Sequence, residues 1–172
     1  MCSSGDDQGG SKVFLSLGSN IGERRKRIEQ AIEALEREGL VAVHRSSIYE
    51  TEPVGLESQP YYLNAVVSAR TNLEPLDLLA MCKRIEAQMG RTQSVRFGPR
   101  VIDIDILLFG ESVVNSDRLA IPHPRMRERR FVLVPLVEVA PSIKDPRDGM
   151  RFIHILRGLD EKKKVTKLRE RE

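Results

Sequence analysis

The run Val101-Ile-Asp-Ile-Asp-Ile-Leu-Leu-Phe109 is apolar and β-branched, which predicts a buried strand, yet it carries Asp103 and Asp105. Side chains alternate between faces along a strand, so both carboxylates point the same way and the isoleucines point the other way. Two like charges roughly 7 Å apart repel each other unless a cation lies nearby. Because the run contains no basic residue, the pattern favours a divalent metal, and two carboxylates plus substrate phosphates suit Mg²⁺. An edge strand with a solvated polar face is the alternative that this run alone leaves open.

Composition predicts one soluble domain. The chain has 172 residues, and 28 Lys and Arg against 25 Asp and Glu give a net charge of only +3, which argues weakly for a nucleic-acid partner. The two cysteines, Cys2 and Cys82, have neither metal-site nor disulfide spacing, which fits a reducing compartment. No apolar run reaches the length of a membrane helix, and residues 1–10 lack the order of a signal peptide. We therefore expect a cytoplasmic protein without membrane or nucleic-acid partners, as a monomer or alternatively a dimer.

The order of expected elements indicates an α+β fold. Strands are expected at residues 12–17, 40–51, 62–71 and 101–109, and amphipathic helices at residues 28–38 and 75–89. The resulting β-α-β-β-α-β order is that of a ferredoxin-like α/β sandwich. A C-terminal extension follows, with a helix over residues 128–139 that Pro135 bends and a short helix near 152–156. We expect residues 1–11 to be a disordered tail, residues 12–160 a single domain, and residues 161–172 a charged tail that frays.

Three further segments offer polar groups to a ligand. Tyr62 and Asn64 share a strand face, and an aromatic ring beside a carboxamide suits a flat heterocycle, although a core Tyr and a strand-end Asn remain the alternative. His123 lies in a stiff Pro-His-Pro segment with several arginines nearby, a grouping that could grip a polyphosphate. In the turn between the first strand and helix, residues 18–22, Asn20 could meet a ligand or cap the helix.

Five segments carry a distinctive combination of motifs. They are, in order, Gly18-Ser-Asn20, Glu50-Thr-Glu-Pro-Val-Gly55, Tyr62-Leu-Asn64, Arg96-Phe-Gly-Pro-Arg-Val-Ile-Asp-Ile-Asp105 and Ile121-Pro-His-Pro-Arg-Met-Arg-Glu-Arg-Arg-Phe131. Together they resemble one enzyme family, the 6-hydroxymethyl-7,8-dihydropterin pyrophosphokinases of folate biosynthesis, and the resemblance extends over residues 12–157.

The resemblance implies a reaction and a set of site residues. It implies that the pyrophosphate of ATP moves to the hydroxymethyl group of the dihydropterin and that AMP leaves, with two Mg²⁺ ions on Asp103 and Asp105. The catalytic residues it implies are Arg91, Arg100, Asp103 and Asp105. Those implied for ATP are Leu79, Glu86, Arg91, Arg100, Ile106, Arg118, Leu119, His123 and Arg129. Those implied for the pterin are Asn20, Thr51, Val54, Gly55, Tyr62, Asn64, Phe97 and Phe131.

The chain departs from the family pattern at three positions, and two other functions compete. Gln93 stands where the family often has a second arginine, Phe97 replaces a common Trp, and Pro124 replaces an aromatic residue. An RNA-recognition module shares the expected fold, but it needs exposed aromatic residues on its central strands and would gain nothing from two aspartates there. A regulatory ligand-binding domain of the same fold would leave the arginine clusters unexplained.

Overall fold

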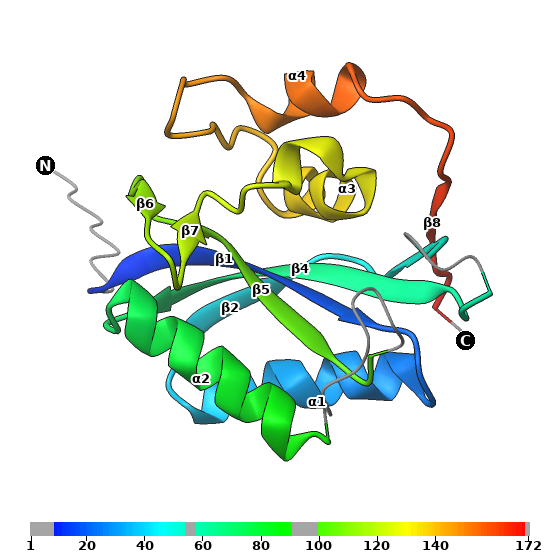
Figure 1. Ribbon diagram of the computed structural model, residues 1–172, viewed down its shortest axis with the longest axis horizontal. Coiled ribbons are helices and arrows are strands. Elements are labelled where there is room, and N and C mark those ends of the chain that lie inside the picture. Colours follow the sequence, from blue (N-terminus) through cyan, green and yellow to red (C-terminus); the bar gives the residue numbers. More distant parts are fainter. Residues whose placement is uncertain (1–8, 54–57, 91–99, 171–172) are drawn as a thin grey trace, which may run out of the picture.

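A computed structural model of the protein describes residues 9–53, 58–90 and 100–170. An antiparallel sheet forms the middle layer, with α1 and α2 on one face and α3 and α4 on the other (Figure 1). Its strands are β1 (Ser11–Ser19), β2 (Val41–Arg45), β3 (Tyr49–Thr51), β4 (Tyr62–Thr71), β5 (Asp103–Phe109) and β8 (Val165–Lys167). A small separate sheet pairs β6 (Val114–Asn115) with β7 (Ala120–Ile121). The helices are α1 (Arg24–Arg37), α2 (Pro75–Gln88), α3 (Arg130–Val139) and α4 (Phe152–Arg157), with a 3₁₀ turn, η1 (Met126–Glu128), before α3.

The order of strands in the main sheet is β5-β1-β4-β3-β8, and β2 also pairs with β4. All of these pairs are antiparallel. The mixed architecture of helices on an antiparallel sheet, which the sequence predicts, is therefore confirmed. Within the described ranges no helix is both long enough and apolar enough to cross a membrane.

The strand expected over residues 40–51 is instead two strands, β2 and β3, because Ser46 interrupts the pairing with β4. The Ser46 hydroxyl accepts the N–H of Val66 at 2.9 Å, while the Ser46 N–H donates to the Val66 carbonyl at 2.8 Å. A side-chain oxygen thus takes the place of a backbone carbonyl as hydrogen-bond acceptor, and regular pairing with β4 resumes at Tyr49.

The C-terminal tail was expected to fray over residues 161–172, and this is wrong for residues 165–167. They form β8, which pairs with β3. The pairing satisfies backbone groups of β3 that would otherwise form a sheet edge. Just beyond β8, Leu168 packs against the hydrophobic core and its N–H donates to the Ile48 carbonyl at 2.8 Å. The many charged residues of the tail give no indication of this backbone pairing or of the apolar contact made by Leu168.

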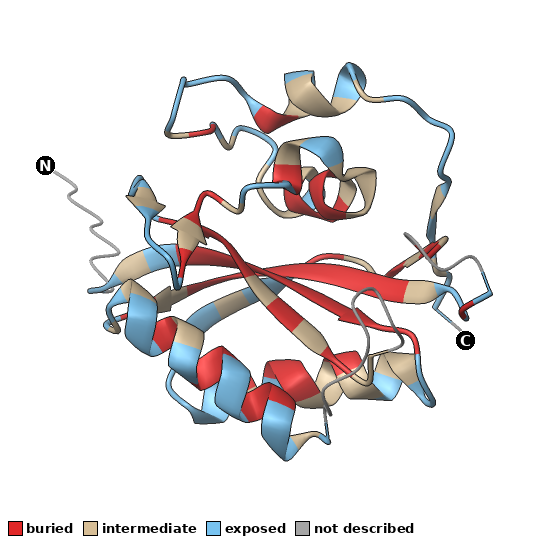
Figure 2. Ribbon diagram, in the orientation of Figure 1, coloured by how far each residue is buried: buried red, intermediate tan, exposed pale blue. Residues whose placement is uncertain are grey.

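Helices α1 and α2 cover one face of the sheet with the apolar stripes that their sequences predict. Ile28 and Ile32 of α1 and Leu78 and Ile85 of α2 are buried. Their spacing, four residues in α1 and seven in α2, places the residues of each helix on one side. Figure 2 shows buried segments, in red, along the sides of both helices that face the sheet. The helices bury this side against one face of the sheet and leave the opposite face to α3, α4 and the pocket described below.

The opposite face carries a second, smaller core. It joins sheet residues to α3 and α4, and its members include Phe14, Val66, Leu108, Leu133, Leu136 and Phe152. The expected helix over residues 128–139 begins at Arg130, two residues later than predicted, and contains Pro135 as expected. The short helix expected near residue 152 is α4.

We expect Phe152→Ala to lower the free energy of unfolding by about 3–5 kcal/mol, because Phe152 is fully buried and the smaller side chain leaves a cavity between α4 and α3. Urea denaturation would measure the change. Val113→Ala is the control, since Val113 is largely exposed and its truncation should cost under about 0.5 kcal/mol. Equal effects of the two substitutions would contradict this role of α4.

Candidate active site

Three neighbouring strands place Asp103, Gly18 and Asn64 side by side on the sheet. Gly18 of β1 pairs with Asp103 of β5 on one side and with Asn64 of β4 on the other. Directly opposed residues of antiparallel strands project from the same face, so the carboxylate and the carboxamide flank a position without a side chain. A Cβ atom at Gly18 would lie 2.9 Å from Asn64 Oδ1, which is closer than real Cβ atoms come. Gly18 therefore keeps the floor of the site open.

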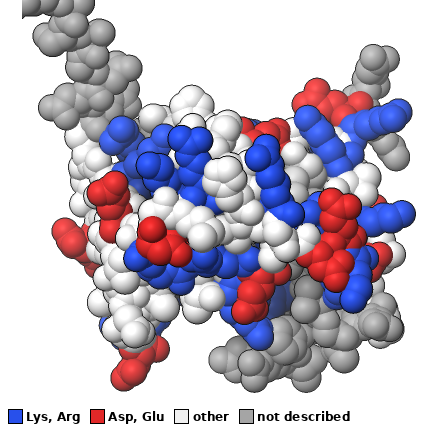
Figure 3. All heavy atoms as spheres, turned by 90° about the horizontal axis from the view of Figure 1, so that it is seen from above, with Lys and Arg blue, Asp and Glu red and all other residues white. Residues whose placement is uncertain are grey.

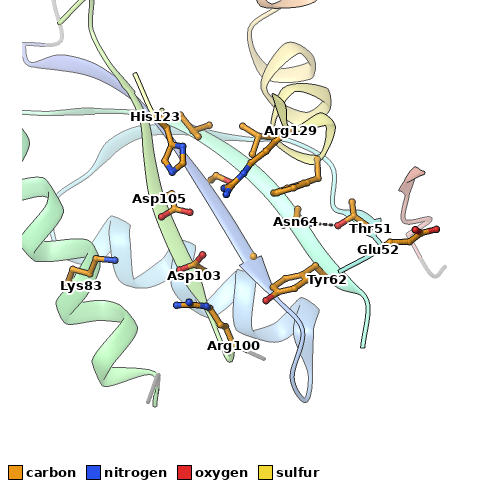
Figure 4. Close-up of a pocket in the computed structure, with 15 residues that line it drawn as sticks. Thr51, Glu52, Tyr62, Asn64, Lys83, Arg100, Asp103, Asp105, His123 and Arg129 are labelled. Carbon is orange, nitrogen blue, oxygen red and sulfur yellow. Dashed lines mark hydrogen bonds between the residues drawn. The ribbon is translucent and has the colours of Figure 1, made fainter. Parts of the chain in front are cut away.

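A pocket of about 300 Å³ lies over this row (Figure 4). Residues from β1, β3, β4, β5 and α2 and from the segment that leads into α3 meet in it. The lining consists of Ser16, Gly18, Thr51, Glu52, Tyr62, Asn64, Lys83, Arg100, Asp103, Asp105, Leu107, His123, Arg129, Phe131 and Val132. Nine of the site residues expected from the sequence are therefore brought together in one pocket.

A second pocket, of about 250 Å³, adjoins the first, since Asp105 and His123 line both. Its lining includes four more of the residues that the sequence assigns to the ATP side, namely Leu79, Ile106, Arg118 and Leu119. The two pockets form a continuous cleft with Asp105 and His123 at their junction and Asp103 in the first pocket.

The two carboxylates of β5 raise the free energy of each other's charged state. Burial and the nearby charge of Asp103 raise the pKa of Asp105 from 3.8 to about 7, although Lys83 and Arg129 counteract part of this. Figure 4 shows Lys83 and Arg129 on different sides of the pair. Mg²⁺ prefers negatively charged oxygen ligands, so the carboxylates of Asp103 and Asp105 fit this ion. Among the described residues, no group of three or more His, Cys, Asp and Glu could hold a metal.

Glu86 of α2 lies beside the acidic pair, but its carboxylate binds the protein's own backbone. Its Oε1 accepts the N–H of Ile104 at 2.7 Å, and its Oε2 lies 3.5 Å from Lys83 Nζ. β5 is an edge strand, so this N–H points away from the sheet and requires another acceptor. The side chain of Glu86 is almost fully buried and lines neither pocket. It fixes the strand that carries Asp103 and Asp105.

His123 is neutral at pH 7 and presents an N–H donor to the pocket. Burial and the charges of Arg129 and Arg125 lower the pKa of His123 to about 4, despite an opposing effect of Asp103. Its Nδ1 accepts the N–H of Arg125 at 3.2 Å, so the ring proton lies on Nε2. Figure 4 shows the ring directed into the pocket beside Asp105. A neutral donor next to an acidic pair suits a phosphate oxygen.

The far side of the pocket presents two aromatic rings and two fixed polar groups. Tyr62 of β4 and Phe131 of α3 both line it, and the guanidinium of Arg129 lies 5.6 Å from the centre of the Phe131 ring. Asn64 Nδ2 donates to Thr51 Oγ1 at 2.6 Å. This bond fixes the carboxamide, so the ring surfaces and the hydrogen-bonding groups stand ready for a flat polar molecule.

Asn20 is not part of the pocket lining, and it does not cap α1, whose first turn has Glu23 at the N-cap. Its Oδ1 accepts the N–H of Arg100 at 2.7 Å, and its Nδ2 donates to Gln59 Oε1 at 3.1 Å and to the Pro60 carbonyl at 3.3 Å. Asn20 thus joins three chain segments beside the pocket.

The other expected residues, Val54, Gly55, Arg91 and Phe97, lie outside the described residues.

Sequence reasoning missed three polar pocket residues, Ser16, Glu52 and Lys83. Lys83 precedes Glu86 by one helical turn, so a search for charged residues on the α2 face nearest the aspartate strand could have found it. Ser16 pairs with Asp105 across β1 and β5, which only the register of the two strands reveals.

Residues 14–141 match the model of the 7,8-dihydro-6-hydroxymethylpterin-pyrophosphokinase (HPPK) family. The chain belongs to this family. It is 44% identical over 157 residues to a Bacillus subtilis 2-amino-4-hydroxy-6-hydroxymethyldihydropteridine pyrophosphokinase. The matched region covers 87% of this chain and 94% of the relative. Identity to the Pseudomonas aeruginosa protein of the same name is 44% over 148 residues, covering 84% and 90%.

Solved structures of HPPK-DHPS proteins share the fold. One described as HPPK-DHPS in complex with substrates superposes with a TM-score of 0.69 at 16% identity, and wild-type Plasmodium falciparum HPPK-DHPS with a TM-score of 0.68 at 16%. The matches cover 86% and 89% of this chain but only 43% and 45% of those longer chains. At this identity the likeness concerns the fold alone.

We expect Asp105→Asn to raise the melting temperature of the Mg²⁺-free protein at pH 7.5. Because the folded-state pKa of Asp105 is raised to about 7, the folded protein binds this proton more tightly than the unfolded chain does. The contribution of Asp105 to stability therefore falls as pH rises from about 4 to about 7, and Asn removes that loss.

Thermal unfolding in EDTA at pH 7.5 and at pH 3.5 would measure the effect, which should disappear at the lower pH because both states are then protonated. Asp160→Asn, at an exposed carboxylate, is the control and should change little at either pH. A lower melting temperature for Asp105→Asn at pH 7.5 would show that the folded state stabilises this charge.

Proposed function

We propose that the protein transfers the pyrophosphoryl group of ATP to the hydroxymethyl group of 6-hydroxymethyl-7,8-dihydropterin. The observation that carries this proposal is the position of the acidic pair in the first pocket, with Asp105 at the junction with the second. One pocket has aromatic and carboxamide groups, and the other has apolar walls with an arginine. In the reaction the substrate hydroxyl oxygen attacks the β-phosphorus, the bond from that phosphorus to the oxygen bridging the α-phosphorus breaks, and AMP leaves. The hydroxyl proton passes to solvent or to a base.

The second pocket would hold the nucleotide. Leu79, Ile106 and Leu119 offer apolar surface to an adenine ring, and Arg118 lies beside them for its ribose or phosphates. The triphosphate would then extend past His123 into the first pocket, where basic side chains can neutralise its charge. These are Lys83, Arg100 and Arg129, and the resemblance to the family adds Arg91 from outside the described residues. Transfer of this kind depends on positioning and charge neutralisation more than on covalent catalysis.

Asp103 and Asp105 would hold Mg²⁺, and the family resemblance suggests two ions. When bound, the metal supplies positive charge that neutralises the phosphate oxygens and relieves the repulsion between the carboxylates. The chain's own contribution is to fix both carboxylates on one strand face, through the strand pairing and through Glu86. Lys83 supplies part of the balancing charge.

The first pocket would hold the pterin. Tyr62 and Phe131 offer ring faces on which a flat heterocycle can stack, and Asn64 and Thr51 offer a donor and acceptors to its edge.

An RNA-recognition function is less favoured, because the aromatic residue of the central strand β1, Phe14, is buried under α3 and α4. Figure 3 shows that on the face formed by these helices basic side chains are interrupted by acidic and neutral ones.

We also propose ferredoxin-like connectivity, a cytoplasmic location and a monomeric state. The connectivity is supported by the order β5-β1-β4-β2 with α1 and α2 on one face. The cytoplasmic location is supported by a thiol usage that suits a reducing compartment, since the described cysteine, Cys82, is a buried free thiol. The monomer is supported by two pockets whose described residues already offer groups for both proposed ligands without a second subunit.

Product analysis tests the proposed reaction. ATP, Mg²⁺ and the dihydropterin alcohol should yield AMP and the dihydropterin diphosphate in equal amounts, as chromatography or ³¹P NMR would show. Asp103→Asn should lose most of this activity because one carboxylate no longer carries charge. Formation of ADP instead of AMP would show attack at the γ-phosphorus and would overturn the proposal.

We expect Gly18→Ala to weaken dihydropterin binding by about 1–3 kcal/mol while leaving the affinity for an ATP analogue nearly unchanged. The added Cβ would collide with Asn64 Oδ1 and displace the carboxamide. Isothermal titration would measure both affinities. Gly158→Ala is the control, because its Cβ would make only ordinary contacts, the nearest at 3.5 Å. Equal losses for both ligands would point to a general disturbance of the sheet.

A further inference from the structure

The carboxylate of Glu138, remote from the pocket, binds the end of α3 to the sheet. Its Oε1 accepts the backbone N–H of Ser47 at 3.0 Å and the Ser47 hydroxyl at 2.6 Å, and its Oε2 accepts the hydroxyl of Tyr49. Both oxygens are therefore used, on a strand and on the loop before it. Glu138 is an exposed residue whose partial desolvation raises its pKa, but the hydrogen bonds from Ser47 and Tyr49 and the charge of Lys167 outweigh this effect. The pKa lies below its ordinary value, so the carboxylate stays charged at neutral pH.

Glu138 and the pocket residue Phe131 lie on the same side of α3. They are seven residues apart, which corresponds to two helical turns and about 10 Å along the axis. Strand β3 likewise has one residue at the Glu138 contact and another at the pocket. Tyr49 pairs directly with Asn64, and Thr51, two residues further along β3 on the same face, accepts the hydrogen bond from Asn64. One end of α3 is thus bound to the strand whose other end forms the polar wall of the pocket.

Apolar contacts alone do not fix where α3 lies along the sheet. Val132, Leu133 and Leu136 bury the helix against the second core, but such burial is non-directional and tolerates small shifts. The N-terminal end of α3 has no side-chain cap at Arg129. Hydrogen bonds, in contrast, are directional and lose strength within a few tenths of an ångström. The three bonds to Glu138 are therefore suited to set the position of α3.

We propose that Glu138, through Ser47 and Tyr49, is a positioning residue that sets the separation between Phe131 on α3 and the Tyr62–Asn64 wall on β4. It touches neither pocket, so it acts through α3 and β3. The consequence is that Glu138 controls affinity for the flat heterocyclic substrate and leaves the phosphate side of the cleft nearly unaffected. This inference rests on the proposed function for its kinetic consequence, but its structural part does not.

Three substitutions separate positioning from mere stability. We expect Glu138→Ala to raise KM for the dihydropterin on the order of tenfold, with kcat at saturation within about threefold and KM for ATP unchanged. Tyr49→Phe, which removes one of the three bonds at nearly constant volume, should give a smaller rise in the same constant. Glu138→Gln should stay near wild type, because its amide oxygen still accepts from Ser47 and the Tyr49 hydroxyl can reverse its hydrogen bond.

Glu38→Ala is the matched control. Glu38 also joins two elements, by an ion pair of 2.7 Å to Arg84 of α2, but it does so on the opposite face of the sheet. It should leave both KM values unchanged. Equal changes in both KM values for Glu138→Ala, or a lower melting temperature with neither KM altered, would overturn the positioning role.

Amide hydrogen exchange without substrates provides the readout that does not depend on the proposed reaction. In Glu138→Ala the amides of α3 should exchange at least several-fold faster than in wild type, while those of α1 keep their rates. Unchanged exchange in α3 would overturn the proposal whatever the enzyme assays show. Faster exchange in a protein whose wild type forms no AMP would instead reject the proposed reaction and retain the positioning role.

Discussion

The repulsion between Asp103 and Asp105 is the constraint around which the rest of the molecule is arranged. Two carboxylates on one face of an edge strand are unfavourable by themselves, and burial makes the second charge harder to form. The fold tolerates this cost because β5 is paired with β1 along its length and the large apolar core on its other face keeps it in place. A site that destabilises the metal-free protein is thereby ready to gain affinity for a cation.

Two glutamates, Glu86 and Glu138, bind helices to the strands that carry the site, and we interpret neither as a substrate ligand. Glu86 closes the open edge of β5 by accepting the N–H of Ile104, so the strand with the carboxylates cannot shift away from α2. Glu138 binds α3 to the loop before β3 and to β3 itself. Each uses a charged acceptor for backbone or hydroxyl donors, which gives stronger and more directional contacts than apolar packing. The proposed nucleotide side and the proposed heterocycle side of the cleft thus have separate anchors.

Much of the fold was predictable because its elements have strong local signals. The 3.6-residue periodicity of Ile28, Ile32, Leu78 and Ile85 predicts both helices of one layer, and each forms where expected. β8 was missed because it lies within a mostly charged segment and its pairing partner, β3, lies more than a hundred residues earlier. The break at Ser46 was missed because it depends on a hydroxyl that meets Val66 only in the folded sheet.

The sequence by itself determined the chemistry of the site: two carboxylates two residues apart on a strand, rings and amides two residues apart on another, and arginines beside a stiff Pro-His-Pro segment. Alternation along a strand is a local property, so the shared face of Asp103 and Asp105 needed no structure. The tertiary structure alone decided which of these groups meet. Strand register set Gly18 between Asp103 and Asn64, and helix packing brought in Lys83 and turned Glu86 toward the backbone. Register and packing are non-local, because they depend on contacts between residues far apart in the chain, and no local pattern contains them.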